Sequence, residues 1–371
     1  MKVAHLTSAH PRDDMRIFHK ECCSLVAAGY DVSLVVADGK GAETKKNIRI
    51  VDVGKASGRL GRVFYTTRKV FKAALAENAA IYHIHDPELI PCGVKLVKAG
   101  KVVIFDSHED VPSQLLAKPY FNKVVARIVS RLFSFYEQWA CKKFNAIVAA
   151  TPFIEEKFLK INPLSVSVNN FPILSEFSFV DSNPSVRDGK EICYVGGISV
   201  IRGIYEIVSS MQFVKSDVKL LLGGKFSERD VEVKTKSLPG WDRVQDLGWL
   251  DRESIANTLA RSSAGLVTLH PVINYLDALP VKMFEYMCAG LPVIASDFPL
   301  WREIIESSKC GVCVDPLDPS KIAEAIDYIV SNPTIAAEMG ANGRAAVLSR
   351  YNWGVEEKKL LDLYLTFQAG L

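Results

Sequence analysis

The sequence has no apolar run long enough to cross a membrane and no recognisable export signal. A membrane-spanning helix needs about 18 consecutive apolar residues, and no segment of the chain approaches that length. The N-terminal stretch MKVAHLTSAHPRDD becomes polar too early for a signal peptide. We therefore expect a cytoplasmic protein.

The chain also lacks a strong charge imbalance and a dinucleotide-binding motif. Its net charge is only +3 at pH 7, which is too small to indicate a nucleic-acid partner. No G-x-G-x-x-G follows the first predicted strand, so a nicotinamide-dependent dehydrogenase is disfavoured.

The eight cysteines are scattered along the chain, and no export signal accompanies them. We expect them to be reduced, small apolar residues. Cys310 and Cys313 have C-x-x-C spacing, but no second pair and no histidines follow them, so the segment is interpreted as a strand rather than a metal or redox site. The cysteines are Cys22, Cys23, Cys92, Cys141, Cys193, Cys288, Cys310 and Cys313.

Apolar, β-branched runs alternate with amphipathic segments along most of the chain. In the first half the predicted strands are 2–8, 31–38, 48–53, 81–86, 101–108 and 146–151, and in the second half 191–197, 218–224, 243–249, 264–270, 292–296 and 311–315. Near-continuous apolar strands that alternate with helices are typical of parallel sheets covered on both faces. The pattern predicts two α/β domains in tandem.

A stretch without periodicity, 173–191, separates the two series of strands. It is rich in Ser, Asn, Asp, Pro and Gly and is predicted to be a linker. We expect an N-terminal Rossmann-like domain over 1–175, a C-terminal one over 188–350, and a helix over 351–371 that packs back on the N-terminal domain.

Ionisable side chains follow two predicted strands of the first domain. His83 and His85 project from one face of their strand and could bind a metal, although histidines at buried strand ends more often bond to the backbone. The next strand ends in Asp106-Ser-His108-Glu109-Asp110. Ligands of parallel sheets bind at the carboxyl ends of strands, so these groups indicate a site more strongly than a helix cap.

Two predicted strands of the second domain end in paired glycines. Gly196-Gly197 is followed by Arg202, and Gly223-Gly224 by Lys225. Glycine pairs permit close backbone approach, and a following helix offers N–H groups to an anion. The two glycine turns, each followed by a cation, suit a diphosphate.

A helix is predicted after Pro280, with Lys282 and Glu285 on one face. As an ion pair at i, i+3 they would contribute only about 0.2–0.5 kcal/mol. The alternative is that both bind a ligand. Val281, Phe284 and Cys288 lie on another face of the helix, which should be buried.

Several motifs together resemble retaining glycosyltransferase family 4. Asp277, seven intervening residues and Glu285 are similar to the family's signature of an acid, seven residues and Glu. YVGGISVIRGI resembles the first loop of its C-terminal domain, and IYHIHDPEL and VVIFDSHED resemble its N-terminal strand ends. The motifs occur in the family's order over nearly the whole chain.

The resemblance implies a GT-B fold of two facing Rossmann-like domains with parallel sheets and a C-terminal crossing helix. It implies catalytic roles for His108, Asp277, Arg202 and Lys282. Donor-binding roles fall on Gly196, Gly197, Arg202, Lys225, Asp277, Lys282 and Glu285. No metal or other cofactor is expected, because cations and helix dipoles fixed in the protein would stabilise the diphosphate.

The chain departs from the family pattern at three places. Asp277 replaces the commoner Glu, and Gly197 stands where many members have Arg. The first loop, SAHPRDDMRIF, lacks a Gly-Gly pair, so its charged residues are expected to shape acceptor binding. The candidate acceptor-binding residues are Arg12, Asp13, Arg16, Asp86 and Glu109.

Two basic segments, 55–76 and 118–143, suggest an anionic partner. In the second, Lys123, Arg127 and Arg131 recur every four residues beside apolar ones. Such a helix can lie on an anionic membrane surface, or it can be an ordinary solvated helix face. Because the family often acts on lipid-linked acceptors, the first interpretation implies peripheral attachment to the inner face of the plasma membrane.

The leading hypothesis is a retaining hexosyltransferase that uses a nucleotide-sugar donor and a glycan or lipid-linked acceptor, in surface polysaccharide or glycoconjugate synthesis. A nucleotide-sugar epimerase of the same fold is one alternative. A non-catalytic nucleotide-sugar-binding protein is another, and charged groups at the strand ends of both domains argue against it.

Overall fold

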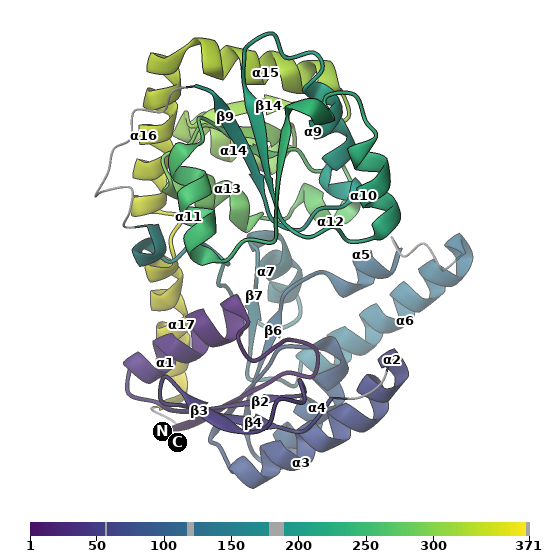
Figure 1. The fold of residues 1–371 in the computed structure, drawn as a ribbon. Coiled ribbons are helices and arrows are strands. Elements are labelled where there is room, and N and C mark those ends of the chain that lie inside the picture. The colour runs from purple at the N-terminus through teal and green to yellow at the C-terminus, as the bar shows by residue number, and fades with distance from the viewer. Residues whose placement is uncertain (56–57, 117–121, 178–188, 369–371) are drawn as a thin grey trace. The chain divides into compact units, whose positions relative to one another are not determined.

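The computed structural model describes residues 1–55, 58–116, 122–177 and 189–368. The chain divides into two compact units (Figure 1). Unit 1 comprises Met1–Asn170 and Trp353–Leu371, and unit 2 comprises Phe171–Asn352. Most of the predicted linker, 178–188, lies outside the described residues.

Unit 1 is built on one sheet with the strand order β3-β4-β2-β1-β5-β6-β7-β8. Its strands are β1 (Lys2–Leu6), β2 (Asp31–Val36), β3 (Glu43–Lys45), β4 (Ile48–Asp52), β5 (Ile81–Ile84), β6 (Val102–Ser107), β7 (Ala146–Ala149) and β8 (Ser165–Ser167). The neighbours pair in parallel, except that β3 and β4 are antiparallel.

The six strands predicted for the first half are confirmed, but the edge strands β3 and β8 were not predicted. Each has three residues, Glu-Thr-Lys and Ser-Val-Ser. Polar edge strands of this length carry no apolar run, because one side is open to water. Sequence periodicity therefore cannot distinguish them from loops.

Unit 2 contains a fully parallel sheet with the order β11-β10-β9-β12-β13-β14. Its strands are β9 (Glu191–Val195), β10 (Lys219–Gly223), β11 (Val244–Gly248), β12 (Gly265–Val267), β13 (Val293–Ser296) and β14 (Gly311–Val314). All six were predicted. The two sheets confirm the α/β, Rossmann-like architecture.

Both faces of the unit 2 sheet are buried, as its continuous apolar strands predict. Cys193 and Val195 of β9 pack into one apolar cluster, and Ile192 and Tyr194 into another. Alternate side chains of a strand point to opposite faces, so the two clusters lie on opposite sides of the sheet. This packing holds the carboxyl ends of the strands in place.

The helices of unit 1 connect its strands, except for the last, and α6 (Lys123–Cys141) is the longest of those described. The described segments are η1 (Met15–Cys22), α1 (Cys23–Ala27), α2 (Gly58–Gly61), η2 (Arg62–Thr66), α3 (Thr67–Glu77), η3 (Pro87–Leu89), α4 (Ile90–Lys98), α5 (Val111–Leu116), α6, α7 (Pro152–Leu159) and α17 (Trp353–Gln368). No helix of the described ranges combines the length and the apolar character needed to cross a membrane.

The last helix, α17, is part of unit 1 although it follows unit 2 in the chain. The indole of Trp353 donates to Ser24 Oγ at 3.0 Å, and the amide of Gln368 donates to Tyr30 Oη at 2.8 Å. Tyr364 is fully buried on the same helix. These contacts attach α17 to the segment that follows β1.

The described helices of unit 2 connect its strands, except for the first and the last two. They are η4 (Leu174–Phe177), η5 (Val200–Arg202), α9 (Ile204–Ser210), α10 (Arg229–Lys236), η6 (Trp241–Arg243), α11 (Arg252–Arg261), α12 (Ile273–Leu276), α13 (Val281–Cys288), α14 (Pro299–Ser308), α15 (Pro319–Ser331) and α16 (Pro333–Ser349). The turn after β9 and the start of α13 carry the residues that matter for the site.

Candidate active site

Two glycine turns lie against each other at the carboxyl edge of the unit 2 sheet. Gly196 and Gly224 both have positive φ, 133° and 153°. A Cβ at Gly224 would lie 1.9 Å from the carbonyl oxygen of Gly196, and one at Gly196 would lie 3.2 Å from Lys282 Nζ. Both the backbone conformation and the close approach require glycine here.

Lys282 reaches this turn from the first turn of α13. Its Nζ is buried and makes no hydrogen bond to any described residue, and it lies 3.6 Å from the centroid of the Tyr194 ring. Burial, together with the nearby charge of Arg202, lowers the pKa of Lys282 to about 7. A buried ammonium group without an anion is a ready site for a negatively charged ligand.

Arg202 brings a second cation to the same turn. Its Nη1 donates to the carbonyl oxygen of Gly197 at 3.0 Å. A Cβ at Gly197 would lie 2.2 Å from that nitrogen. Arg202 therefore fills the space that a side chain at position 197 would occupy. The two cations and the open glycine turn form an arrangement that suits a diphosphate.

The ion pair between Lys282 and Glu285 that the spacing allowed is absent from the described structure. Glu285 Oε1 instead accepts a hydrogen bond from Arg252 Nη1 at 2.9 Å. Phe284 and Cys288 are buried as expected, but Val281 is only half-buried. Lys282 points toward the glycine turn and Glu285 toward α11, so neither neutralises the other.

The remaining donor candidates flank this turn less closely. Asp277 is half-buried and ends α12, just before the extended Pro280 that caps α13. Lys225 is exposed directly after the second glycine turn, and its carbonyl oxygen accepts from the backbone of Ile198 at 3.0 Å. Neither side chain forms a hydrogen bond or ion pair with Lys282 among the described residues.

In unit 1, His108 lies beside a fixed carboxylate at the end of β6. His108 Nε2 is 2.9 Å from Asp106 Oδ2, and its side chain is 20% exposed. Arg16 donates to both oxygens of Asp106, at 2.8 and 2.7 Å. Burial alone would raise the pKa of Asp106, but Arg16 and His108 hold it well below its ordinary value. Asp106 therefore remains ionised and orients the His108 ring.

A neighbouring pair, His10 and Asp86, extends this polar group. His10 Nδ1 is 3.0 Å from Asp86 Oδ1, and the rings of His10 and His108 are 4.9 Å apart between centroids. Burial opposes protonation of His10, but its hydrogen bond to Asp86 raises the pKa of His10 overall. His10 was not among the residues predicted from the sequence, although it lies in the first loop, SAHPRDD, after β1.

The other acceptor candidates differ in how far they are exposed to solvent. Arg12 is buried, and its guanidinium donates to Asp38 at 2.8 and 2.7 Å and to Glu43 at 2.7 Å. Such complete engagement favours a structural role for Arg12, and Arg16 is similarly occupied. Asp13 and Glu109 are exposed, so they are the acceptor candidates accessible to a ligand.

Two groups of described residues have the composition and spacing of metal ligands. One contains His85, Asp106 and His108, and the other contains His5, Glu21, His83 and His85. In the first group the carboxylate of Asp106 is already bound at both oxygens by Arg16. A cation there would have to displace that guanidinium, so this group does not suit a metal.

Family models match most of the chain. The model described as "Glycosyltransferase Family 4" matches residues 17–168, and "Glycosyl transferases group 1" matches 177–346. The matched ranges contain Asp106 and His108 in unit 1 and the glycine turn with Lys282 in unit 2. The chain belongs to glycosyltransferase family 4.

Relatives of this family 4 chain are distant in sequence. The phosphatidyl-myo-inositol mannosyltransferase of Mycolicibacterium smegmatis is 21% identical over 363 residues, which cover 92% of this chain and 87% of the relative. The α-D-kanosaminyltransferase of Streptomyces kanamyceticus is 21% identical over 254 residues, which cover 64% of each chain.

Solved structures show that the family 4 chain has the GT-B fold. Sucrose-phosphate synthase from Thermosynechococcus elongatus superposes with a TM-score of 0.78 at 20% identity and 100% coverage of both chains. The Anabaena protein HepE in complex with UDP and glucose gives a TM-score of 0.75 at 15% identity, covering 99% of this chain and 100% of that one.

Proposed function

We propose that this enzyme transfers a hexose, with retention of configuration, from a nucleotide sugar to a glycan or lipid-linked acceptor. The observation that carries the proposal is Lys282, a buried ammonium without a hydrogen-bond partner among the described residues, beside the glycine turn and Arg202. A diphosphate would supply the missing anion. Catalysis then follows from cations that stabilise charge on the departing nucleoside diphosphate.

We propose roles for the donor-side residues from their positions and from the family pattern. Arg202 and Lys282 bind the diphosphate against the Gly196-Gly197 backbone, with Lys225 contributing a further charge. Glu285 accepts hydrogen bonds from the nucleotide ribose, and a ribose there would share Glu285 with Arg252. Asp277 contacts hydroxyl groups of the donor sugar. These fixed cations do the work that a bound metal does in other transferases.

In unit 1, we assign His108 the role of contacting the donor sugar near the reacting centre. Asp106 and Arg16 hold the His108 ring in place and are positioning residues. The acceptor hydroxyl attacks the anomeric carbon of the donor sugar from the same face as the departing nucleoside diphosphate, whose bond to that carbon breaks. A phosphate oxygen of the donor takes the proton of the hydroxyl. This front-face route retains configuration without the pair of carboxylates used by glycosidases. Asp13 and Glu109 are proposed to contact the acceptor, whereas Asp86, which is buried and paired with His10, is proposed to position that histidine.

Relatives support a nucleotide-sugar donor and a surface glycoconjugate as product. HepE binds UDP and glucose. WaaG, described as involved in lipopolysaccharide biosynthesis, superposes with a TM-score of 0.73 at 14% identity, covering 96% of this chain and 98% of that one. The mycobacterial relative is named for a phosphatidyl-myo-inositol acceptor.

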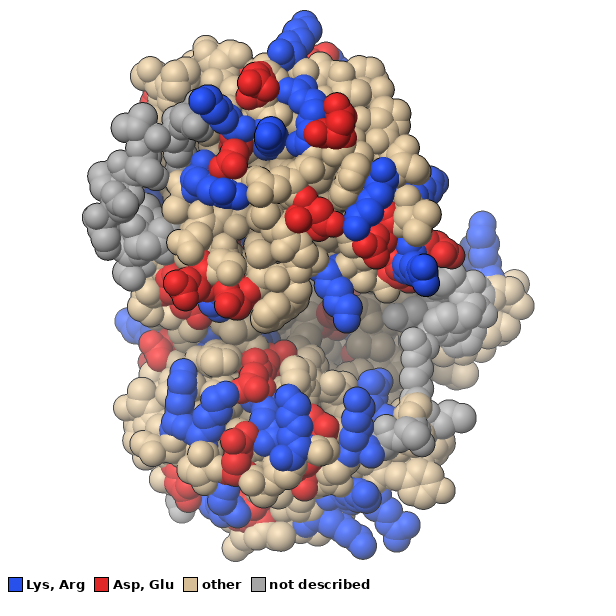
Figure 2. All heavy atoms as spheres, viewed as in Figure 1, with Lys and Arg blue, Asp and Glu red and all other residues tan. Residues whose placement is uncertain are grey.

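We further propose that unit 1 contacts an anionic membrane at the cytoplasmic face. On α3, Arg68, Lys69 and Lys72 are exposed, and Figure 2 shows basic side chains gathered over this part of unit 1. On α6, apolar side chains are exposed beside Lys123, Arg127 and Arg131. Cations attract anionic head groups while apolar side chains enter the interface.

The test of the proposed function begins with donor identity. A thermal-shift panel of UDP-, GDP-, ADP- and dTDP-sugars should reveal one ligand that raises the melting temperature, because a ligand that binds only the native state stabilises it. Turnover of that donor is then measured with Glu285→Ala. We expect loss of turnover and weaker donor binding, whereas Glu324→Ala, an exposed glutamate on α15, should behave as the wild type.

Two outcomes would contradict the proposal. Full activity of Glu285→Ala would overturn the donor-site assignment. Conversion of the donor into an epimer in the absence of any acceptor would instead identify a nucleotide-sugar epimerase.

A further inference from the structure

Three histidines gather on one face of the unit 1 sheet, beneath the carboxyl edge. His5 of β1 pairs in register with His83 of β5, and His85 follows two positions later, so all three side chains point to the same face. Their ring centroids are 4.7 to 5.1 Å apart. Glu21 of η1 completes the group, and all four side chains are at most 2% exposed.

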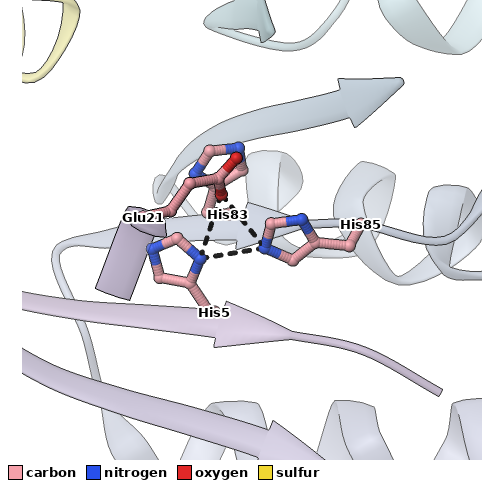
Figure 3. A group of neighbouring side chains, drawn as sticks. All are labelled: His5, Glu21, His83 and His85. Atoms are coloured by element: carbon pink, nitrogen blue, oxygen red, sulfur yellow. Dashed lines mark hydrogen bonds and ion pairs between the residues drawn. The ribbon is translucent and has the colours of Figure 1, made fainter. Parts of the chain in front are cut away.

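The polar atoms of His5, Glu21 and His85 face one another, and the His83 ring lies beside them (Figure 3). One ligand atom from each of the four residues lies within 4.8 Å of the others. His5 Nδ1 is 2.9 Å from His85 Nε2, and Glu21 Oε2 is 3.8 Å from each of those nitrogens. Zinc–ligand bonds of about 2.1 Å place tetrahedral ligand atoms roughly 3.4 Å apart. The observed separations lie on either side of that value.

The remaining nitrogen of each imidazole is held by a partner. His85 Nδ1 is 3.1 Å from Asp106 Oδ2, and His83 Nδ1 is 2.8 Å from Tyr364 Oη. His5 Nε2 is 3.4 Å from the same hydroxyl. Metal-binding histidines almost always have such an outer partner, which fixes the ring and the tautomer. The pattern leaves one lone pair of each ring for the centre.

Of the atoms that face the centre, His5 Nδ1 and His85 Nε2 lie within hydrogen-bond distance of each other, whereas those of Glu21 and His83 have no hydrogen-bond partner among the described residues. Among the described residues, both carboxylate oxygens of Glu21 and Nε2 of His83 are buried and have no hydrogen-bond partner. Arg16 approaches Glu21 Oε1 to 3.1 Å, but its nitrogens donate to Asp106 and to the carbonyl oxygen of Val168. A buried polar atom of this kind implies an additional ligand, since native interiors rarely leave such atoms unsatisfied.

We propose that His5, Glu21, His83 and His85 bind a structural zinc ion in the core of unit 1. Three imidazole nitrogens and one carboxylate oxygen suit zinc in a tetrahedral site. Four protein ligands close the coordination sphere and leave no position for a reacting water, so the ion ties β1 and β5 to η1. It is distinct from the donor chemistry, for which no metal is expected.

The ion would also support the candidate acceptor side. Asp106 contacts both His85, a ligand, and His108. If the ion holds the His85 ring in place, the hydrogen bond from that ring keeps the Asp106 carboxylate in position to bind His108. The zinc site acts through these positioning contacts and touches no substrate.

Metal content of the full chain tests the proposal directly. The protein is purified without a polyhistidine tag or chelator from zinc-supplemented cells and analysed by mass spectrometry for bound metals. We expect about one zinc per chain. Protein stripped of metal and titrated with Co²⁺ should show the visible absorption bands of tetrahedral cobalt, saturating at the same stoichiometry. A chain that carries no zinc and gives no cobalt bands overturns the proposal.

Variants locate the site. Glu21→Gln and His83→Ala should lose stoichiometric zinc, while His270→Ala should keep it, because His270 pairs with Glu206 at 2.9 Å in unit 2. His108→Ala should also keep the zinc; loss there would overturn the ligand set in favour of the group containing Asp106 and His108. A folded His83→Ala variant that holds as much zinc as the wild type would also overturn the ligand set.

A variant of a residue that contacts the ligands covers the case in which the ligand variants fail to fold. Tyr364→Phe removes the hydroxyl that holds two of the rings but leaves all four ligands. We expect zinc affinity to fall by about 10- to 100-fold, measured by competition with a chromophoric chelator. Unchanged affinity in Tyr364→Phe would contradict the geometry proposed here.

Discussion

At the residue scale, the most informative side chain is Lys282. Burying an ammonium group without a partner costs free energy. The lowered pKa of Lys282 reduces this cost, because the amine can give up its proton more easily. The lysine is held there by the packing of α13, whose neighbouring residues Met283 and Phe284 are fully buried. The same packing places Nζ at the Gly196 turn. The proposed donor site is therefore maintained at some expense in stability.

The lowered pKa of Lys282 predicts how donor affinity depends on pH. In the proposed site the anionic donor binds the protonated form of Lys282, whose pKa in the free protein is about 7. Affinity should be greatest below pH 7 and should fall by about tenfold per pH unit above it, since donor binding must then also take up a proton. Calorimetric titration with the best donor of the thermal-shift panel, between pH 6 and pH 9, measures this slope.

Substitutions separate this effect from general changes in charge. Lys282→Arg should remove the slope, because arginine stays protonated throughout the range, and Lys282→Ala should bind weakly at every pH. Lys321→Ala, which removes an exposed lysine of α15, should keep the wild-type profile. A flat profile in the wild type would show that Lys282 does not bind the donor.

At the scale of elements, α6 is unusual because its apolar residues face water. Ile128, Leu132 and Phe135 are 54%, 65% and 70% exposed, whereas Ala126 and Ser130 on the opposite face are buried. An amphipathic helix normally buries its apolar face. Here the exposed apolar stripe lies beside the basic residues, as expected for a helix that lies on a membrane.

The exposed stripe on α6 predicts binding to vesicles. We expect the wild type to co-sediment with vesicles containing anionic lipid at low salt, and less so at high salt, because salt screens the attraction. Leu132→Glu/Phe135→Glu should stay in the supernatant without losing more than about 0.5 kcal/mol in stability, since exposed positions tolerate substitution.

The control for α6 is Leu348→Glu, at a residue of α16 in unit 2 that is 50% exposed. This variant should co-sediment like the wild type. Failure of the wild type to bind anionic vesicles at either salt concentration would refute the membrane contact.

At the scale of the whole molecule, unit 1 is built from two segments of the chain, and its last helix, α17, follows unit 2. Leu360 and Tyr364 of α17 are fully buried, and Trp353 is 5% exposed. The backbone N–H of Asn169 donates to Glu356 on the same helix at 2.8 Å. Unit 2, by contrast, is one continuous segment with apolar clusters on both faces of its own sheet.

This difference predicts that the two units behave differently when separated. A fragment of residues 171–352 should fold alone and bind the nucleotide, because it holds both its core and the glycine turns. A fragment of residues 1–170 should lack cooperative unfolding, because removal of α17 leaves buried apolar positions exposed. Circular dichroism during urea titration, with calorimetry for nucleotide binding, measures both.

Co-expression supplies the control for the fragment experiment. Adding residues 353–371 as a separate chain should restore cooperative unfolding to fragment 1–170. If that fragment unfolds cooperatively without the helix, α17 is not needed for the core of unit 1.

The sequence by itself determined the strands, the α/β class and the family motifs. The reason is local: a strand buried on both faces needs an unbroken apolar run, and a glycine turn needs glycine whatever surrounds it. For the same reason the predicted Gly196 turn and the buried Phe284 are found where expected. The short polar strands β3 and β8 carry no such local requirement and were missed.

Only the tertiary structure decided which polar groups meet. Spacing allowed Lys282 to pair with Glu285, but Arg252, 33 positions away, takes Glu285 and leaves Lys282 beside the glycine turn. His5 and Glu21 likewise have no local pattern that links them to His83, since the contact depends on the register of two strands and on the helix that covers them. Local sequence determines which residues are buried, but the partner of a buried charge depends on packing between distant segments.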